Sequence, residues 1–265
     1  GINHNGDIEL AKRLVSVAAQ AGCDAVKGQK RTLDVVFDDE KLNQPRQSPF
    51  GTTNRDVWNR LELPIEVHRE IDAYARTFGL RWTASAWDEA SVGDVLSLEP
   101  EFLKIASASL TDDGLLRAYR GHGVPIVLST GMSTIAEIDH AVEILGTDDL
   151  ILLHCTSNYP SQPGELNLRM IPVLRERYGV PIGYSGHEIG IAASISAVAM
   201  GACMVERHIT IDRSLFGSNQ AASLEPQELA DLVAGIRTVE AALGDGVKRV
   251  YESEIPVRAR LRRVG

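Results

Sequence analysis

The sequence is poor in cysteine, and its few cysteines are scattered. Its 265 residues include 3 cysteines, at positions 23, 155 and 203, with no Cys-x-x-Cys pair and no Asn-x-Ser/Thr sequon. An odd, widely spaced set of this kind excludes a disulfide scaffold. We therefore expect reduced thiols, packed as small apolar side chains in a cytoplasmic protein.

A surplus of basic residues and a long apolar run are also missing. Acidic residues outnumber basic ones, 36 to 27, and the net charge of -9 would repel a phosphate backbone. The most apolar stretch, residues 191–205, is interrupted by Ser194 and Ser196 and is shorter than the ~20 residues of a membrane span. We expect neither nucleic acid nor a membrane as a partner.

The glycine-rich turn of nucleotide-binding folds is missing as well. An open, doubly wound Rossmann sheet needs such a turn after its first strand, and neither Gly-x-Gly-x-x-Gly nor a P-loop occurs. Instead, short strand-like apolar runs alternate with longer segments of helical period, which is typical of βα units around a parallel sheet. The strand-like runs are residues 25–29, 80–85, 102–106, 125–129, 150–154, 181–184 and 203–207. The helical segments are residues 8–21, 64–78, 89–98, 113–119, 135–145, 166–178, 189–200 and 226–243.

The number of these runs favours a barrel. Seven strands and eight helices, with no strand before the first helix, predict an α/β fold of the (β/α)8 TIM barrel type. Its first strand would be truncated, with residues 1–3 as the remnant. We assign residues 1–245 to the barrel and residues 246–265 to a basic tail or linker. Residues 30–63 are too long for an ordinary βα loop, and we expect them to cover the active site rather than to be disordered.

Polar side chains close the predicted strands. The active site of a TIM barrel lies at the carboxyl ends of its strands, so these side chains should share one mouth. Lys27 and Lys104, with several hydroxyl groups, suit a small phosphorylated or carboxylated anion, although strand-end lysines can also simply reach solvent. Asn158 and Tyr159 follow in a Pro-flanked loop, where an amide and a hydroxyl suit a polyhydroxylated substrate. The other strand-end residues are Gln29, Ser85, Ser107, Ser129, Thr130, His154, Ser157, Ser185, His187 and His208.

Two histidines close neighbouring strands. Adjacent parallel strands lie about 4.8 Å apart, so His187 and His208 could share one divalent metal in an open site completed by water or substrate. Such a metal would act as a Lewis acid at a carbonyl. A lone strand-end histidine is more commonly a hydrogen-bonded scaffold residue, which is our interpretation of His154. We interpret Cys155 as a core side chain rather than a nucleophile.

Seven motifs stand out when these positions are read together. They are Gly1-Ile2-Asn3-His4-Asn5-Gly6, Val26-Lys27-Gly28-Gln29, Phe102-Leu103-Lys104-Ile105-Ala106-Ser107, Leu128-Ser129-Thr130-Gly131-Met132, His154-Cys155-Thr156-Ser157-Asn158-Tyr159-Pro160, Gly183-Tyr184-Ser185-Gly186-His187-Glu188 and Glu206-Arg207-His208-Ile209-Thr210. On these motifs the chain resembles the sialic acid synthase (N-acetylneuraminate synthase) family across essentially its whole length. The resemblance implies a barrel transferase of carbohydrate biosynthesis that forms a C–C bond. It would condense phosphoenolpyruvate with an N-acetylhexosamine, normally N-acetylmannosamine, and water to a nonulosonic (sialic) acid and phosphate.

The resemblance also implies roles for individual residues. Phosphoenolpyruvate would be held by Lys27, Ser85, Lys104, Ser107, Ser129, Ser157 and Ser185. His187 and His208 would bind Mn or Mg. The catalytic positions that face the sugar would be Gln29, Tyr159 and Asn219.

The sequence departs from the family pattern in four places. The family's acidic residue before the first motif lies outside this sequence, and Gly28 stands where a larger residue is common. Asn219, in Gly217-Ser218-Asn219-Gln220, is an amide where the family has a carboxylate that contacts the sugar. The small C-terminal antifreeze-like domain of the family, which reaches the partner's active site with an arginine, would begin where this sequence ends. We therefore expect a homodimer for the full-length protein and leave the oligomeric state of this chain open.

Two questions stay open at this point. The sugar could instead be a legionaminic or pseudaminic acid precursor, or a spore-coat sugar. The chain could also be a catalytically impaired relative that binds metal and phosphoenolpyruvate without turnover, because it lacks the carboxylate at position 219. Phosphate release with a panel of N-acetylhexosamines would distinguish these possibilities.

Overall fold

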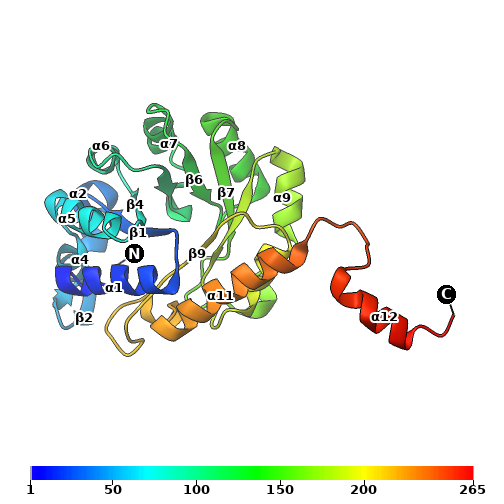
Figure 1. Ribbon diagram of the computed structural model, residues 1–265. Helices are drawn as coiled ribbons and strands as arrows, with labels where there is room; N and C mark the ends of the chain where they lie inside the picture. The colour runs from blue at the N-terminus through cyan, green and yellow to red at the C-terminus, as the bar shows by residue number, and fades with distance from the viewer. Residues whose placement is uncertain (1, 265) are drawn as a thin grey trace.

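The protein is built around a curled parallel sheet with helices packed outside it (Figure 1). The computed structural model describes residues 2–264, and all seven predicted strands are present. Their order across the sheet follows their order in the chain. The strands are β1 (Ala25–Lys30), β4 (Arg81–Ala86), β5 (Leu103–Ile105), β6 (Ile126–Ser129), β7 (Leu150–Cys155), β8 (Ile182–Gly186) and β9 (Val205–Arg207).

The predicted helices are also confirmed, three of them at the predicted bounds. They are α1 (Ile8–Ala21), α5 (Ile65–Arg76), α6 (Glu89–Leu96), α7 (Asp113–Arg120), α8 (Ile135–Leu145), α9 (Met170–Tyr178), α10 (Ala192–Ala199) and α11 (Pro226–Leu243). Local capping explains the sharp ends: the Asp7 carboxylate accepts the first backbone N–H groups of α1, and Gly22 ends that helix at a φ of 82°. α9 and α10 begin later than predicted, because Asn167 and Gly190 adopt left-handed φ angles of 42° and 79°.

The predicted barrel class is confirmed, but its first strand is not formed among the described residues. Ile2 lies in irregular backbone and Asn3 in a turn, while Gly1 lies outside the described part of the chain. The Asn3 side chain instead donates hydrogen bonds to Ile209 O, at 2.8 Å, and to Ser223 Oγ, at 2.7 Å. Within residues 2–264 the sheet therefore stays open between β1 and β9, which form its two edges.

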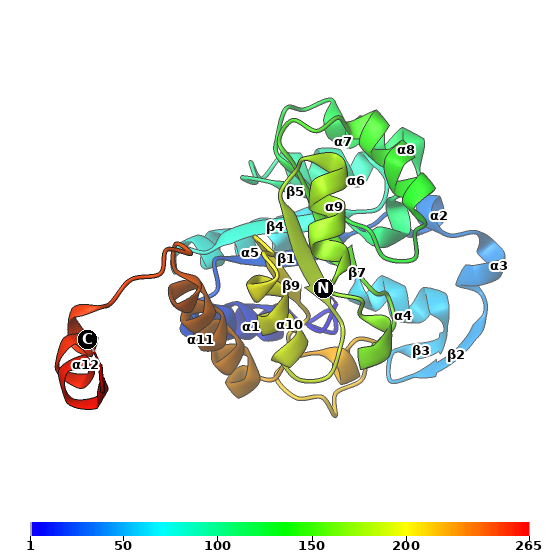
Figure 2. The same ribbon diagram turned by 90° about the vertical axis from the view of Figure 1, so that its right-hand side faces the viewer.

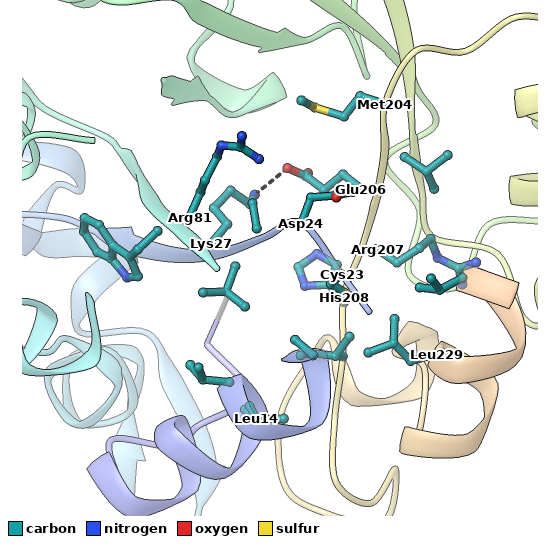
Figure 3. A pocket seen from close by; sticks show the side chains of 18 of the residues that line it. Leu14, Cys23, Asp24, Lys27, Arg81, Met204, Glu206, Arg207, His208 and Leu229 are labelled. Carbon is teal, nitrogen blue, oxygen red and sulfur yellow. Dashed lines mark ion pairs between the residues drawn. The ribbon is translucent and has the colours of Figure 1, made fainter. Parts of the chain in front are cut away.

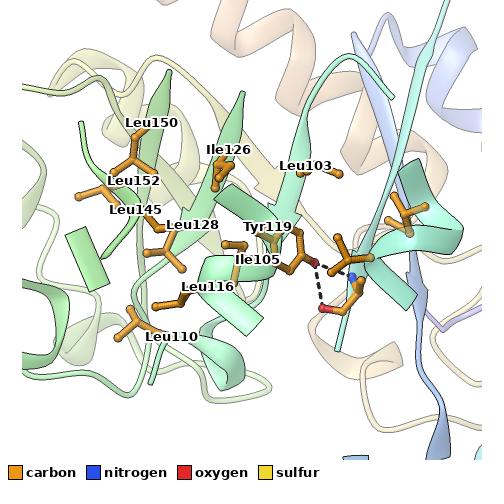
Figure 4. Close-up of a cluster of buried hydrophobic side chains, with 14 of the residues drawn as sticks. Leu103, Ile105, Leu110, Leu116, Tyr119, Ile126, Leu128, Leu145, Leu150 and Leu152 are labelled. Carbon is orange, nitrogen blue, oxygen red and sulfur yellow. Dashed lines mark hydrogen bonds between the residues drawn. The ribbon is translucent and has the colours of Figure 1, made fainter. Parts of the chain in front are cut away.

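A dense apolar core lies around β5, β6 and β7 (Figure 4). Tyr119 of α7 is fully buried there, and its hydroxyl accepts a hydrogen bond from Ala86 N at 2.8 Å. The same hydroxyl lies 2.9 Å from Ala86 O and 2.9 Å from Lys104 O, and these two carbonyl oxygens share its single proton. Because β4 and β5 pair directly only at Ser85 and Lys104, Tyr119 holds the junction that carries these two predicted site residues. The labelled apolar neighbours are Leu103, Ile105, Leu110, Leu116, Ile126, Leu128, Leu145, Leu150 and Leu152.

The long segment after β1 is folded. It contains α2 (Leu33–Val36), α3 (Asp39–Leu42), the antiparallel pair β2 (Pro45–Ser48) and β3 (Gly51–Thr53), and α4 (Asn54–Leu61). Phe50 at the β2–β3 turn packs edge-on against Phe216 in the loop after β9, with ring centroids 5.5 Å apart. This contact joins the segment to the side of the sheet that carries His208. Its expected role as an active-site cover stays a prediction.

The end of the chain stands away from the barrel. After α11, a short 3-10 turn, η4 (Glu252–Glu254), leads into α12 (Ile255–Leu261), which projects from the molecule in both views (Figures 1 and 2). Ile255, Val257 and Leu261 are exposed on it. None of the helices in residues 2–264 is long and apolar enough to cross a membrane.

Candidate active site

Strand register brings the predicted anion-binding residues side by side. Gln29 of β1 pairs with Ser85 of β4, and Ser85 pairs in turn with Lys104 of β5. On the other side, Ser185 of β8 pairs with Glu206 of β9. Because side chains alternate between the two faces of a strand, this register points a row of polar groups toward the inside of the curled sheet.

Glu206 lies at the centre of this arrangement. Its Oε2 is 3.2 Å from Lys27 Nζ and 4.0 Å from Lys104 Nζ, and its Oε1 accepts a hydrogen bond of 3.0 Å from Ser185. Figure 3 shows Lys27 and Glu206 pointing toward each other from the two edge strands. Burial by itself would raise the pKa of Glu206, but the two lysine charges hold it well below its ordinary value.

Sequence reasoning missed Glu206, although a signal was present. The residue lies two positions before His208 in the motif Glu206-Arg207-His208. Alternation along a strand places residues two apart on the same face, so a predicted inward His208 implied an inward Glu206.

Lys104 is deeply buried, and its amine makes two hydrogen bonds. Its side chain is 2% exposed, and Nζ donates to Ile105 O at 2.8 Å and to Ser129 Oγ at 2.7 Å. Burial lowers the pKa of Lys104 to about 8, and the neighbouring Glu206 opposes that shift. A buried ammonium with a partly compensated charge is suited to accept an incoming anion.

The predicted serines leave room for such an anion. Ser85 Oγ is buried and has no hydrogen-bond partner among the described residues, which suits a group that awaits a ligand. Ser107 Oγ accepts the N–H of Gly131 at 2.9 Å. A Cβ on Gly131 would lie 2.2 Å from Ser157 Oγ and 2.9 Å from Ser107 Oγ, so only glycine lets these two hydroxyl groups approach the backbone here.

The two predicted metal ligands lie next to each other. Gly186 pairs with Arg207 across β8 and β9, so His187 and His208 follow at the next step, with ring centroids 5.3 Å apart. His187 Nδ1 is 2.9 Å from the carbonyl of Thr156 and must donate to it, which leaves Nε2 with a free lone pair. Burial holds the pKa of His208 well below its ordinary value, which favours its neutral form.

These two imidazoles fit an open divalent-metal site. Among the residues that the structure describes, no group of three or more His, Cys, Asp or Glu side chains is placed to hold one ion. Two imidazole nitrogens would supply part of a divalent-ion site, and the other coordination positions would belong to water or substrate oxygens, which are the ligands that Mn and Mg prefer.

The aromatic and sulfur side chains of the predicted site surround the histidines. Tyr159 packs against both rings, with centroid distances of 4.2 Å to His187 and 5.7 Å to His208, and burial raises the pKa of its hydroxyl. Cys155 is buried, with Sγ 3.8 Å from His187 Nδ1. His154 Nε2 donates to Leu166 O at 2.7 Å, which is the scaffold hydrogen bond expected for it.

The remaining predicted residues are bonded to other partners. The Gln29 amide oxygen, with the amide correctly oriented, accepts from the guanidinium of Arg31 at 3.1 Å. Asn158 Nδ2 donates to Glu165. Asn219 lies at the start of the short turn η3 (Gln220–Ala222), where its side chain accepts from Ser218 at 3.2 Å. Asn219 lies outside the cavity lining described next, as do Gln29, Tyr159 and all the predicted serines except Ser185.

The charged residues line one cavity of about 510 Å³. Its lining includes Lys27, Lys104, Ser185, His187, Glu206 and His208. The cavity continues between β1 and β9 toward Arg81 and Met204 at the opposite end of the strands (Figure 3). The two lysines predicted to bind the anion and the two histidines thus line one cavity.

Comparison with known proteins agrees with this arrangement. Residues 14–248 match the NeuB family. The chain is 37% identical to N,N'-diacetyllegionaminic acid synthase of Legionella pneumophila, over 99% of this chain and 77% of that protein. It is 38% identical to human N-acetylneuraminate-9-phosphate synthase, over 98% of this chain and 74% of that protein. The crystal structure of N-acetylneuraminic acid synthetase from Leptospira borgpetersenii in complex with citrate superposes with a TM-score of 0.86 at 33% identity, covering 100% of this chain and 90% of that one.

The curled βα sheet with lysines and histidines at its mouth is that of a barrel synthase, and the chain belongs to the NeuB family. The relatives confirm the expectation of a phosphoenolpyruvate-dependent transferase of the sialic acid synthase type.

Proposed function

We propose that the chain condenses phosphoenolpyruvate with an open-chain N-acetylhexosamine and water, producing a nonulosonic acid and phosphate. The observation that carries the proposal is the single cavity shared by Lys27, Lys104, His187 and His208. Two ammonium groups suit the phosphate and carboxylate of phosphoenolpyruvate, and two imidazoles suit a divalent ion beside it. The cavity thus offers a place for each of the two reacting partners.

The anion end positions phosphoenolpyruvate. Lys27 and Lys104 would neutralise its charges, and Ser129 and Ser185 are already oriented by Lys104 and Glu206. The orphaned Ser85 hydroxyl would donate to the bound anion. These contacts would fix C3 of phosphoenolpyruvate toward the histidine end.

The histidine end positions the sugar. His187 and His208 would hold a divalent ion, which when bound would polarise the sugar aldehyde as a Lewis acid. Tyr159 lies against both rings, and Gln29 lies next to Ser85, so these two side chains would contact sugar hydroxyl groups. Gln29, Tyr159 and Asn219 all lie outside the cavity lining, so the sugar would meet them beyond the two histidines.

The bonds change as follows. C3 of phosphoenolpyruvate attacks the aldehyde carbon and forms the new C–C bond, which leaves positive charge at C2. The carboxylate of Glu206, held between the two lysines, stabilises that charge. The aldehyde oxygen, which takes the π electron pair of its C=O bond when the C–C bond forms, accepts one proton from the water that adds at C2. The C2–O bond to phosphate then breaks as the C2 hydroxyl gives its proton to the departing phosphate, which leaves a ketone.

The first test measures phosphate release from phosphoenolpyruvate in the presence of Mn and each of several N-acetylhexosamines. Turnover should disappear with a chelator and return with Mn. Lys27→Ala and Lys104→Ala should each weaken phosphoenolpyruvate binding by a few kcal/mol, the scale of one buried charge-assisted contact, with sugar affinity changing much less. Lys30→Ala is the matched control, because Lys30 lies on the same strand but pairs with Asp94.

The identity of the sugar is a separate part of the proposal. We propose N-acetylmannosamine as the acceptor, with precursors of legionaminic, pseudaminic or spore-coat sugar acids as the alternatives in the same panel. Binding of phosphoenolpyruvate and Mn without phosphate release on any sugar would favour the impaired relative instead. In that case an Asn219→Asp variant that restores turnover would identify the missing carboxylate as the cause.

A further inference from the structure

A buried ion pair lies directly behind the two histidines. Arg207 precedes His208 and Glu188 follows His187 in the chain. Arg207 Nη1 lies 3.0 Å from Glu188 Oε1, and the two side chains are 2% and 4% exposed. Strand alternation explains the position: with His187 and His208 inside the sheet, Arg207 and Glu188 point to its outer face, toward α10.

Further hydrogen bonds hold the pair, although Arg207 Nε is buried without a partner among the described residues. The Glu188 carboxylate accepts from the Tyr184 hydroxyl at 2.9 Å and from Ser194 Oγ of α10 at 2.7 Å. The Arg207 guanidinium also donates to Gly190 O at 2.8 Å and to Glu188 O at 2.5 Å. It therefore binds both the side chain and the backbone of the residue that follows His187.

Gly186 leaves the space that this pair occupies. A Cβ at position 186 would lie 2.5 Å from Glu188 Oε2 and 3.1 Å from Arg207 Cδ. The cavity-facing residues Ser185, His187, Glu206 and His208 do not need a glycine here. The outer-face pair gives this position of the Gly183-Tyr184-Ser185-Gly186-His187-Glu188 motif its physical reason.

An ion pair is a costly way to stabilise a core. Removing two charges from water costs several kcal/mol for each ion, and well-packed apolar residues of the same volume are often at least as stable. Instead, this pair fixes a distance, because it links the carboxyl ends of two adjacent strands. The bond from His187 Nδ1 to Thr156 O fixes the rotation of one ring but not the spacing between the two.

We propose that Glu188 and Arg207 are positioning residues, which set the spacing and direction of the His187 and His208 imidazoles so that both can reach one divalent cation. Arg207 borders the cavity, but its guanidinium is bonded to Glu188 and Gly190, so neither residue of the pair is assigned to cation or substrate. The proposal rests on the metal site of the proposed function and adds to it the residues that hold the ligands in place.

The experiment measures Mn binding to the metal-free protein by calorimetry and by electron paramagnetic resonance, without substrate. The variant Glu188→Met/Arg207→Met removes both charges together and avoids leaving one of them buried alone. We expect its Tm to stay close to that of the parent and its Mn affinity to fall about 10- to 100-fold, the range for outer-shell partners of metal ligands.

Two further variants make the comparison sharp. Arg31→Met/Glu62→Met removes another buried pair, in which Arg31 Nε lies 2.5 Å from Glu62 Oε1 and the side chains are 5% and 14% exposed. That pair has no contact with the histidines, so Mn affinity should stay at the parent value. Arg207→Lys keeps the charge but cannot make the forked contacts, and it should still lower Mn affinity if the double variant fails to fold.

The outcomes separate this proposal from the metal site itself. A parent that binds no Mn, or binds it equally after His187→Ala, would overturn the metal assignment. Unchanged Mn affinity in the folded Glu188→Met/Arg207→Met variant would overturn the positioning role. Histidine NMR of the metal-free proteins is an independent test. The His187 Nδ1–H signal should broaden in the Glu188→Met/Arg207→Met variant and stay sharp in the Arg31→Met/Glu62→Met control. An unchanged signal in both variants contradicts the proposal.

Discussion

Lys27, Lys104 and Glu206 form a charge cluster with two positive groups and one negative group. The carboxylate lies within 4.0 Å of both amines, so the cluster carries a single net positive charge before substrate binds. An incoming phosphate would share both lysines with Glu206. This arrangement limits the cost of burying two ammonium groups and still leaves the cavity attractive to an anion.

At the same scale, the buried amine of Lys104 gives anion binding a pH dependence. Burial lowers the pKa of Lys104 to about 8, so the amine is charged below this pH and loses its charge above it. The Kd for phosphoenolpyruvate should rise about tenfold for each pH unit above 8, roughly 30-fold between pH 7 and 9.5. Calorimetric titrations across this range would measure the rise.

The variant Lys104→Arg is the control for this dependence. A guanidinium stays charged throughout the range, so the variant should bind more weakly than the parent but with a nearly constant Kd. A parent protein whose Kd is the same at pH 7 and 9.5 would show that Lys104 does not bind the anion.

Among the elements, α5 and β1 share an unusual contact. His68 of α5 is 2% exposed and lies against the strand, where a Cβ on Gly28 would approach its Cε1 to 3.2 Å. The ring also packs near Trp82 of β4, with centroids 5.6 Å apart. The glycine at position 28, a departure from the family pattern, is thus matched by an imidazole that fills the adjacent space.

This packing makes stability depend on pH. Burial, helped by the charge of Lys30, lowers the pKa of His68 to about 4 from an ordinary value of 6.5. Folding therefore favours the neutral ring, and the stabilisation is complete above pH 6.5 and lost as the pH falls from 6.5 to 4. The free energy of unfolding should lose about 2 kcal/mol from this group between pH 7.5 and 5.

Urea unfolding at the two pH values tests this contribution. His68→Leu should show a loss smaller than that of the parent by about 2 kcal/mol, and the exposed His122→Gln should behave like the parent. An equal loss in the parent and in His68→Leu would mean that this helix–sheet contact does not govern acid sensitivity.

On the scale of the whole molecule, the described sheet has two edges. β1 and β9 each pair on one side only, and the ion pair of Lys27 with Glu206 joins them across the gap. The Asn3 side chain adds a further tie on the β9 side. Strands β6 and β7 lie in the middle of the sheet, bonded on both sides and packed against the dense core.

Local stability should follow this pattern. Amide hydrogen exchange measured by mass spectrometry should be slowest in peptides covering β6 and β7, and faster in those covering β1 and β9, because edge strands open at lower free energy. Lys27→Ala should accelerate exchange in β9 specifically, while the control Lys30→Ala should not. Uniform protection across all seven strands would contradict the open sheet.

Local patterns in the sequence determined the elements of this protein. Alternating apolar runs predicted every strand of the sheet, and the bounds of α1, α8 and α11 could be read directly, because capping and helical period act within a few residues. Two helix starts were missed where Asn167 and Gly190 take left-handed backbone, a choice that residue type permits but does not impose.

The tertiary structure decided which side chains meet. Lys27 and Glu206 are 179 residues apart in the chain (206 minus 27), and only the curvature of the sheet brings them to 3.2 Å. The Glu188–Arg207 pair depends on the register of β8 against β9, and the position of Asn219 outside the cavity depends on the fold of its loop. Hydrophobic periodicity determines whether a segment forms a helix or a strand. Distances across the sheet depend on register and curvature, which arise only when all the strands pack together.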